Sequence, residues 1–369
     1  MQFSKNPELK VQSETYIVSR RAHNVFLALV LILNFFFIMA SHAQAGNSAV
    51  IFVYHRFGED KYPSTSIKLE QFEAHLAELE SGGYTVMALP KIIKALKTGI
   101  PLPDKTIALT IDDAYLSVYE NAWPRLKELG FPFTLFVATD PVDKGIKGYM
   151  SWSQIQELRQ NGVTIGSQTA SHLHMAFADP FTNLSELKKS NNRFLEKLGI
   201  TPKLFAYPYG EASENVEKLV QNYGFIAAFG QHSGVASKSP DMFYLPRFSL
   251  NENYGDIKRF KLAANALALN TSDLSPSNPM INKGNDNPPA FGFTITGDVS
   301  LTNRLGQLQC YSSHEGNLGV TTLGGENGQT RIEIRMKKQL PTGRTRLNCT
   351  LPTNEGRWYW FGRQFLLEN

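Results

Sequence analysis

Apolar and polar positions recur along the chain with two different periods, and the change of period divides the sequence. From residue 48 to about residue 268, short apolar runs that favour strands alternate with longer segments whose apolar positions have helical spacing. The expected strands are residues 48–54, 106–111, 134–138, 163–166 and 204–207. The expected helices are residues 69–81, 91–98, 118–129, 152–161, 185–198 and 213–223. Strands that alternate with helices predict a parallel α/β sheet or barrel.

After residue 290 the pattern becomes one of short segments with alternating apolar positions, separated by Gly, Asn and Pro. The expected strands are residues 291–296, 307–312, 330–336, 344–349 and 357–361. They predict a small antiparallel β-sandwich of about 80 residues. The intervening residues 269–290 are rich in Ser, Asn and Pro, which is typical of a linker. We therefore expect an α/β domain over 46–268, a linker over 269–290 and a β-sandwich over 291–369.

The beginning of the chain has the pattern of an export signal. A basic segment around Arg20 precedes an apolar run over 25–40, and Ala43 and Ala45 give the small-x-small pattern of signal peptidase sites. An uncleaved anchor is the competing interpretation, but the apolar run falls short of the ~20 residues that cross a bilayer. We expect a signal peptide over 1–45, a periplasmic or secreted mature chain, and contact with a membrane only transiently through that peptide.

Composition narrows the classes of protein further. Hydrophobic residues make up 42% of the 369 residues and charged residues 19%, so the chain has enough apolar side chains for large cores. A net charge of only +4 argues against a nucleic-acid partner. The two cysteines, Cys310 and Cys349, are too few for a structural zinc cluster. Any metal must then bind oxygen and nitrogen ligands, and in an oxidising compartment the two cysteines can form a disulfide.

Polar side chains follow four of the predicted strands at the points where those strands end. They are the pair Asp112 and Asp113, the pair His172 and His174, the Pro-aromatic-Gly turn at 207–210, and His55. Each has an ordinary explanation, since an Asp after a strand can cap a helix and an isolated His usually lies on the surface. In a barrel, however, the carboxyl ends of the strands carry the chemistry. Four such clusters therefore indicate one site for a metal and for acid–base groups.

In this order the four segments resemble the polysaccharide deacetylases of carbohydrate esterase family 4, the NodB homology domain. The resemblance covers about residues 49–267 and rests on Tyr54-His55, Thr110-Ile-Asp-Asp113, Phe205-Ala-Tyr-Pro-Tyr-Gly210 and Leu245-Pro246-Arg247-Phe248. It looks most like the branch that acts on bacterial exopolysaccharides of N-acetylglucosamine. It implies a distorted (β/α) barrel and a metal-dependent hydrolase that removes N-acetyl groups from a polysaccharide.

The resemblance also implies a role for each matching residue. Asp113 and His172 would be ligands of a divalent metal, with zinc as the first candidate. Asp112 would be the base that deprotonates the attacking water, and His55 would protonate the leaving amine. The backbone N–H of Tyr209 would stabilise the oxyanion. The turn as a whole, Tyr207, Pro208 and Tyr209, would contact the substrate.

Two departures from the family pattern leave alternatives open. Gln168 stands where the family has the first histidine of its metal motif, and a neutral amide oxygen binds zinc less well than imidazole does. The site could use Gln168 or His174 as the third ligand, it could have an altered metal preference, or the chain could be a catalytically impaired carbohydrate-binding protein.

The second departure is Ala206, which stands where many relatives have an arginine that orients the catalytic aspartate. We expect Arg247 to replace that arginine with a forked contact. A further alternative for the function is an esterase that removes O-acetyl groups from a polysaccharide with the same machinery.

Overall fold

The computed structural model describes residues 47–368 except 239–240, 285, 298 and 326–327. The predicted signal peptide, residues 1–45, lies outside the described residues, and the chain from Gly46 to Asn369 forms one compact unit. Within the described residues, no helix combines the length and the apolar character that a membrane span requires.

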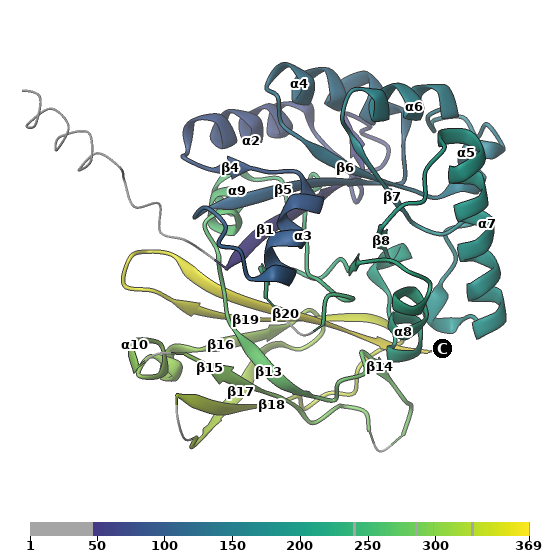
Figure 1. Ribbon diagram of the computed structural model, residues 1–369. Helices are drawn as coiled ribbons and strands as arrows, with labels where there is room; N and C mark the ends of the chain where they lie inside the picture. The colour runs from purple at the N-terminus through teal and green to yellow at the C-terminus, as the bar shows by residue number, and fades with distance from the viewer. Residues whose placement is uncertain (1–46, 239–240, 285, 298, 326–327, 369) are drawn as a thin grey trace, which may run out of the picture. The chain divides into compact units, whose positions relative to one another are not determined.

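The first half of this unit is an α/β fold built on a mostly parallel sheet in the order β10-β1-β5-β6-β7-β8-β9 (Figure 1). Its strands are β1 (Ser48–Tyr54), β4 (Thr85–Val86), β5 (Thr106–Asp112), β6 (Phe133–Val137), β7 (Thr164–Ser167), β8 (Leu204–Ala206), β9 (Ala227–Phe229), β10 (Ala236–Ser237) and β11 (Phe248–Ser249). A separate pair is formed by β2 (Arg56–Phe57) and β3 (Ser66–Ile67). Every residue of β5 is buried, as expected for a central strand that is covered on both faces.

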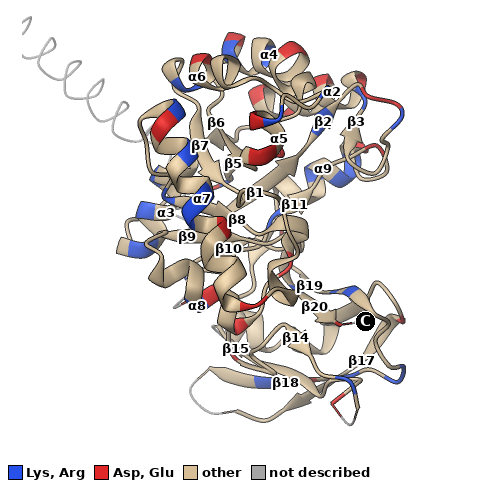
Figure 2. Ribbon diagram, turned by 90° about the vertical axis from the view of Figure 1, so that its right-hand side faces the viewer, with Lys and Arg blue, Asp and Glu red and all other residues tan. Residues whose placement is uncertain are grey.

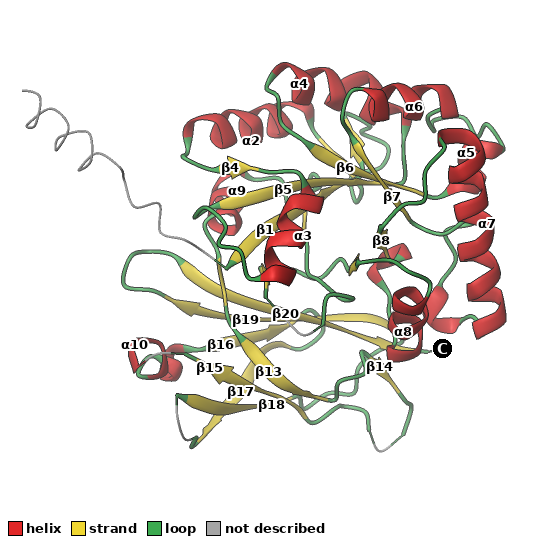
Figure 3. Cartoon of the chain, in the orientation of Figure 1, coloured by secondary structure: helices red, strands yellow, loops and turns green. Residues whose placement is uncertain are grey.

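The helices lie around the outside of this sheet, as Figure 3 shows. They are α2 (Leu69–Ser81), α3 (Leu89–Thr98), α4 (Trp123–Glu128), α5 (Thr139–Asp143), α6 (Trp152–Gln160), α7 (Pro180–Leu198), α8 (Glu214–Asn222) and α9 (Ile257–Ala264), and a π-helical turn (Val118–Ala122) precedes α4. Helix α7 shows why such segments begin and end where they do: Asp179 caps its first turn, and Gly199 ends it in a left-handed conformation. Helices α4 and α6 carry both basic and acidic residues, whereas the charged residues of α2 are all acidic (Figure 2).

The sheet curves towards closure through a segment late in the fold. Phe229 of β9 forms a parallel bridge with Leu245, and β11, three residues later, pairs in parallel with β1. This segment therefore lies between the two edges of the sheet and makes a distorted barrel. The predicted (β/α) barrel is confirmed, although the sequence pattern did not identify β9, β11, α5 or α9 as elements.

The second half is a mainly antiparallel sheet in the order β12-β20-β19-β16-β17-β18-β15-β13. Its elements are β12 (Leu267–Ala268), β13 (Thr271–Ser275), β14 (Met280–Ile281), β15 (Phe291–Thr296), α10 (Val299–Thr302), β16 (Gln309–Ser312), β17 (Gly316–Leu323), β18 (Gln329–Arg335), β19 (Gly343–Pro352) and β20 (Trp358–Leu367). The first part of β17 pairs with β16 and its later part with β18, so the strand joins two layers around one apolar core. The expected antiparallel β module is thus present.

The residues expected to form a linker contribute strands to this second sheet. Strand β13 pairs with β15, and β14 pairs with β20. Because β13 reads Thr-Ser-Asp-Leu-Ser and is only partly buried, it carries little apolar signal in the sequence. The division into domains at residues 269–290 stays a prediction.

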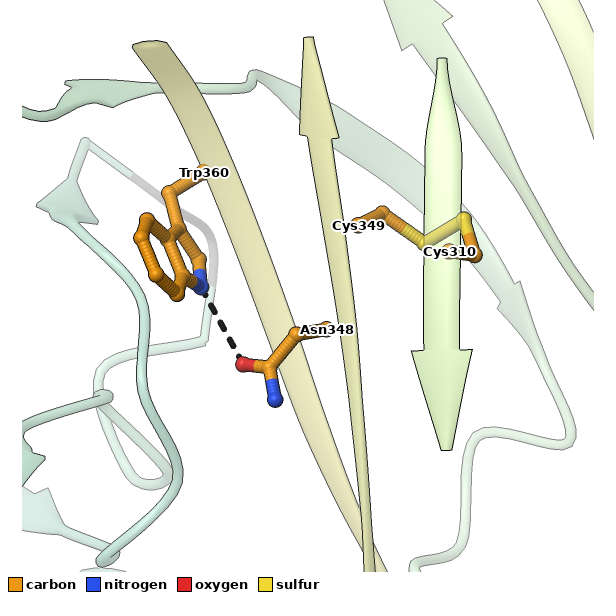
Figure 4. Close-up of a disulfide and its surroundings, with 4 residues drawn as sticks. All are labelled: Cys310, Asn348, Cys349 and Trp360. Atoms are coloured by element: carbon orange, nitrogen blue, oxygen red, sulfur yellow. Dashed lines mark hydrogen bonds between the residues drawn. A yellow bond between two sulfur atoms is a disulfide. The ribbon is translucent and has the colours of Figure 1, made fainter. Parts of the chain in front are cut away.

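A disulfide joins the two cysteines inside the second core. Cys310 of β16 lies opposite Cys349 of β19, and both side chains are fully buried (Figure 4). The residues are separated by 39 positions. Closing a loop of about that length stabilises a fold by roughly 4 kcal/mol in the chain-entropy model.

The two sheets are in direct contact along β20. A Cβ atom at Gly362 would lie 1.7 Å from the carbonyl oxygen of Ser233, so only glycine allows this approach. Trp360 packs edge-on against Phe248 of the first sheet, and its Nε1 donates to Asn348 (Figure 4). The neighbouring Phe361 packs instead on the second core. Neighbouring side chains of β20 therefore have different roles: Phe361 packs on the second core, and Trp360 forms part of the contact between the sheets.

Candidate active site

The residues singled out in the sequence gather at the carboxyl edge of the first sheet. Asp112 is the last residue of β5, Gln168 follows β7, and His55 follows β1 directly. Parallel strands bring these ends to the same edge. A cleft of about 720 Å³ opens there, and its lining includes His55, Asp113, His172 and Tyr209.

Asp112 is held by a buried guanidinium. Arg247 donates from Nη1 to Asp112 Oδ1 and from Nη2 to Oδ2, each at 2.8 Å, and both side chains are 0% exposed. Arg247 is fixed in turn by the carbonyl oxygen of Gly230 at 2.9 Å and by Thr110 Oγ1 at 3.1 Å. A two-pronged contact of this kind fixes the plane of the carboxylate as well as its position. The structure therefore brings together the two residues that the sequence pattern paired.

His55 lies beside this carboxylate, and a third residue connects them. His55 Nε2 is 3.9 Å from Asp112 Oδ2. The Gln231 side-chain amide nitrogen lies 3.4 Å from each of these two atoms. Sequence reasoning missed Gln231 because the short strand β9, which delivers it to the same edge, was not identified. Recognition of that strand would have pointed to the residue.

Asp113 and His172 form a second pair. His172 Nε2 is 3.3 Å from Asp113 Oδ1, a buried oxygen without a hydrogen-bond partner among the described residues. Burial alone would raise the pKa of Asp113, but the imidazoles of His172 and His55 outweigh it and lower that pKa to about 2. For His172, burial opposes the charged form, while Asp113 favours it and leaves the pKa raised. Asp113 is therefore an anion at neutral pH.

Gln168 lies next to Asp113 and His172 and is the third potential metal ligand. Its Oε1 accepts from the Asp113 backbone N–H at 3.3 Å, and its Nε2 lies 3.1 Å from His172 Nε2. His172 Nε2 thus faces two groups with opposite requirements. To bond to the carboxylate it must carry a proton, whereas to accept from the amide NH₂ it must have a free lone pair. A cation between Asp113 and His172 would resolve this conflict, with the amide turned to present its oxygen.

The spacing of these atoms also fits a metal. Two ligands bonded to one tetrahedral ion at about 2.1 Å lie about 3.4 Å apart, close to the Asp113–His172 separation. Among the described residues no three His, Cys, Asp or Glu side chains form a metal site, so the third ligand would be the Gln168 amide. Carboxylate, imidazole and amide oxygen together suit a divalent cation, with lower affinity for zinc than a second imidazole would give.

His174 contacts Glu211 and Tyr209 and not the pair of Asp113 and His172. Its Nδ1 is 2.6 Å from Glu211 Oε2, and its ring stacks on Tyr209 at 3.9 Å between centroids. These contacts support the turn after β8 and favour Gln168 over His174 as the third donor.

Several residues at the carboxyl edge of the first sheet have an unfavourable backbone conformation. Seven non-glycine residues in the described part of the chain have positive φ, and five of them belong to this edge of the sheet, namely Asp113, Ala114, Thr169, His172 and Tyr209. Such conformations persist where the surrounding structure holds them, often at functional sites.

Of the predicted substrate-contacting residues, Tyr209 lines the cleft, whereas Tyr207 and Pro208 are buried. Tyr207 donates its hydroxyl to the Phe243 carbonyl, so its position indicates packing rather than substrate contact.

Comparisons with known proteins point to one group of enzymes. A sequence model of the family described as Polysaccharide deacetylase matches residues 99–228. YxkH of Bacillus subtilis (strain 168), assigned by its name to the polysaccharide deacetylases, is 28% identical over 198 residues, which are 53% of this chain and 69% of that protein.

A second relative and a solved structure agree with this. The poly-β-1,6-N-acetyl-D-glucosamine N-deacetylase of Staphylococcus aureus (strain MSSA476) is 22% identical over 216 residues, covering 55% of this chain and 73% of that protein. The structure of IcaB from Ammonifex degensii matches with a TM-score of 0.53 at 26% identity, covering 60% of this chain and 98% of that chain. The second sheet begins beyond residue 228, outside the match to the family model.

Proposed function

The chain belongs to the polysaccharide deacetylases of carbohydrate esterase family 4, which are hydrolases, and we propose that it removes N-acetyl groups from an N-acetylglucosamine-containing polysaccharide. The observation that carries the proposal is the arrangement of two differently held aspartates. Asp112 is fixed by Arg247, while Asp113 is paired with His172. This difference supports Asp112 as the group that moves a proton and Asp113 as a ligand of a cation.

The metal would be held by Asp113, His172 and Gln168, and zinc is the first candidate. When bound, a divalent ion lowers the pKa of a water ligand and polarises a carbonyl oxygen. The ionised Asp113 supplies the negative charge of the site. Gln168 supplies a neutral oxygen and so limits the affinity.

The remaining steps belong to residues of the chain. Asp112 takes the proton of the attacking water, and Arg247 keeps its carboxylate from turning away. The backbone N–H of Tyr209 would stabilise the oxyanion that forms on the acetamide carbonyl. His55, next to Asp112, then protonates the amine as it leaves the acyl carbon. The products are acetate and a free amino sugar.

The proposed location is outside the cytoplasm, in the periplasm or the medium. It is supported by the disulfide between Cys310 and Cys349, which persists in oxidising compartments. The signal pattern before Ala45 supports the same location. The activity that the printed name of the Staphylococcus aureus relative describes, on an N-acetylglucosamine polymer, is compatible with it.

Replacing Gln168 with histidine is expected to tighten metal binding. An imidazole nitrogen in place of an amide oxygen would raise zinc affinity by about tenfold or more. Titration with zinc against a competing chelator measures the change, and Gln160→His, on the exposed end of α6, is the matched control. Equal zinc affinity in the wild type and the Gln168→His variant would show that position 168 does not contact the metal.

Replacing Arg247 with lysine is expected to lower kcat by about 10- to 100-fold while KM and metal content stay the same, because lysine keeps the charge but loses the fork. Arg247→Met should have a larger effect and also lower stability by about 3–5 kcal/mol, since Asp112 would remain buried without a partner. Arg335→Lys, on an exposed strand position, is the control. Undiminished kcat in the Arg247→Lys variant would refute the positioning role.

A binding protein without catalysis is the second candidate, and Gln168 is the observation that favours it. Such a protein would bind N-acetylglucosamine oligomers but release no acetate, with or without added metal. An esterase would instead release acetate from O-acetylated polysaccharide and not from N-acetylglucosamine oligomers.

A further inference from the structure

Strand β19 of the second sheet contributes two arginines to the candidate active site. Arg344 and Arg346 line the same cleft as His55, Asp113 and Tyr209. They are two positions apart and so point to the same face of the strand. The alternate residues Thr345 and Leu347 are buried. The match to the family model ends at residue 228, so both arginines lie outside the matched residues.

Arg344 is anchored to the turn that carries the proposed oxyanion donor. Its Nη1 donates to the Tyr209 carbonyl at 2.9 Å. Its Nε lies 3.6 Å from Glu211 Oε1, a buried carboxylate that also holds His174. Arg344 therefore ties β19 to the edge of the first sheet, and Glu211 offsets part of its charge.

Arg346 has no such compensation. Its backbone forms hydrogen bonds of 2.8 and 2.9 Å with Ser313, but its guanidinium makes no ion pair or hydrogen bond with the described residues. The buried Nε lacks a hydrogen-bond partner among them. Burial and then the charge of Arg344 lower the pKa of Arg346, so the surroundings disfavour its positive charge. A desolvated guanidinium without an acidic partner is costly unless a ligand supplies one.

The rest of the cleft does not supply that negative charge. Asp113 is the one acidic residue among the described residues that line it, and Asp113 is occupied by His172 and the proposed metal. Neutral groups also line the cleft, including the aromatic rings of Tyr209 and Tyr254 and the amides of Asn251 and Asn253. The volume of about 720 Å³ is in the range of sites that enclose ligands larger than one small group.

We propose that Arg344 and Arg346 form an anion subsite for a carboxylate or phosphate on a sugar next to the N-acetylated one. The substrate is then an acidic polysaccharide, for example one with alternating uronic acid or with phosphate substituents. This inference rests on the proposed function for its placement of the acetylated sugar. Guanidinium groups bind both kinds of anion through paired N–H donors, and charge-assisted bonds of this kind are the stronger ones.

The test compares matched charged and neutral oligosaccharides. Binding is measured by calorimetry with a hyaluronan oligosaccharide, in which N-acetylglucosamine alternates with glucuronate, and with its carboxyl methyl ester. A second pair is an N-acetylglucosamine oligomer with and without a 6-phosphate on one sugar. We expect at least tenfold tighter binding of the charged member in one pair or both, with a preference that weakens as salt is raised. The pair that shows the preference identifies the anion.

Variants then assign the preference to the arginines. Arg346→Gln is expected to bring the ratio of the affinities for the charged and the neutral oligosaccharide close to one. Arg344→Gln, at an exposed position, is expected to reduce this ratio at least threefold, and it provides the test if Arg346→Gln does not fold. Arg335→Gln on β18 is the control and should keep the full preference. A wild-type ratio near one in both pairs, or a ratio unchanged in both cleft variants, would overturn the subsite. Acetate release by the wild type from the neutral N-acetylglucosamine oligomer is recorded separately, so a failure of the proposed function is distinguished from a failure of the subsite.

Discussion

Replacing Asp113 with alanine is expected to remove the divalent metal and to reduce acetate release from N-acetylglucosamine oligomers at least about a thousandfold. Asp113 is the anionic donor of the proposed site, with a pKa lowered to about 2. Its loss leaves His172 and Gln168, two neutral donors that hold a divalent ion poorly. The measurements are metal content of the purified protein by elemental analysis and turnover under saturating substrate.

Two further variants make this result specific. Asp113→Asn keeps the shape of the side chain and should lose the metal as well, which separates loss of charge from loss of packing. Asp60→Ala, at an exposed position, should retain both metal and activity. A full complement of metal in Asp113→Ala would place the metal elsewhere and contradict the assignment of this ligand.

Replacing Asp112 with asparagine is expected to give the opposite combination, with the metal retained and the activity lost. The amide keeps an oxygen for Arg247 but cannot accept the proton of the attacking water. Loss of a general base costs about 10²- to 10⁴-fold in rate. The variant should keep its metal content and its KM, and kcat should fall by that factor.

Stability must be followed in the same experiment. Both Asp112 and Arg247 are fully buried, so neutralising one partner leaves the other charge without compensation and costs about 3–5 kcal/mol. Activity is therefore measured well below the melting temperature of the variant. Turnover within twofold of the wild type in Asp112→Asn would exclude this residue as the base.

The sequence pattern located those elements whose signal is strong and local. Strand β1 and helix α2 begin and end at the predicted residues, and β5 was predicted to within one residue. The apolar run of β5 and the helical spacing of α2 depend on few distant contacts. Strands β9 and β11, of three and two residues, are set by closure of the barrel, which local propensity does not encode.

The residues of the candidate site also differ in how far local sequence signals could predict them. Asp112, Asp113 and His55 were predictable because each directly follows or ends a readable strand. Gln231 was missed because it follows β9, and the turn of His174 towards Glu211 depends on side-chain contacts. Arg344 and Arg346 line the cleft because the second sheet contacts the first along β20 and Arg344 bonds to the Tyr209 carbonyl. The spacing of residues along the chain does not predict such a contact.

The most direct test of the central claim is acetate release from N-acetylglucosamine oligomers by the purified protein, before and after removal of metal with a chelator. The account predicts release of acetate with appearance of free amines in equal amounts, loss of both after chelation, and recovery when zinc or another divalent metal is restored. Acetate release that persists in full after complete removal of metal, or no release with any divalent metal added, would contradict it.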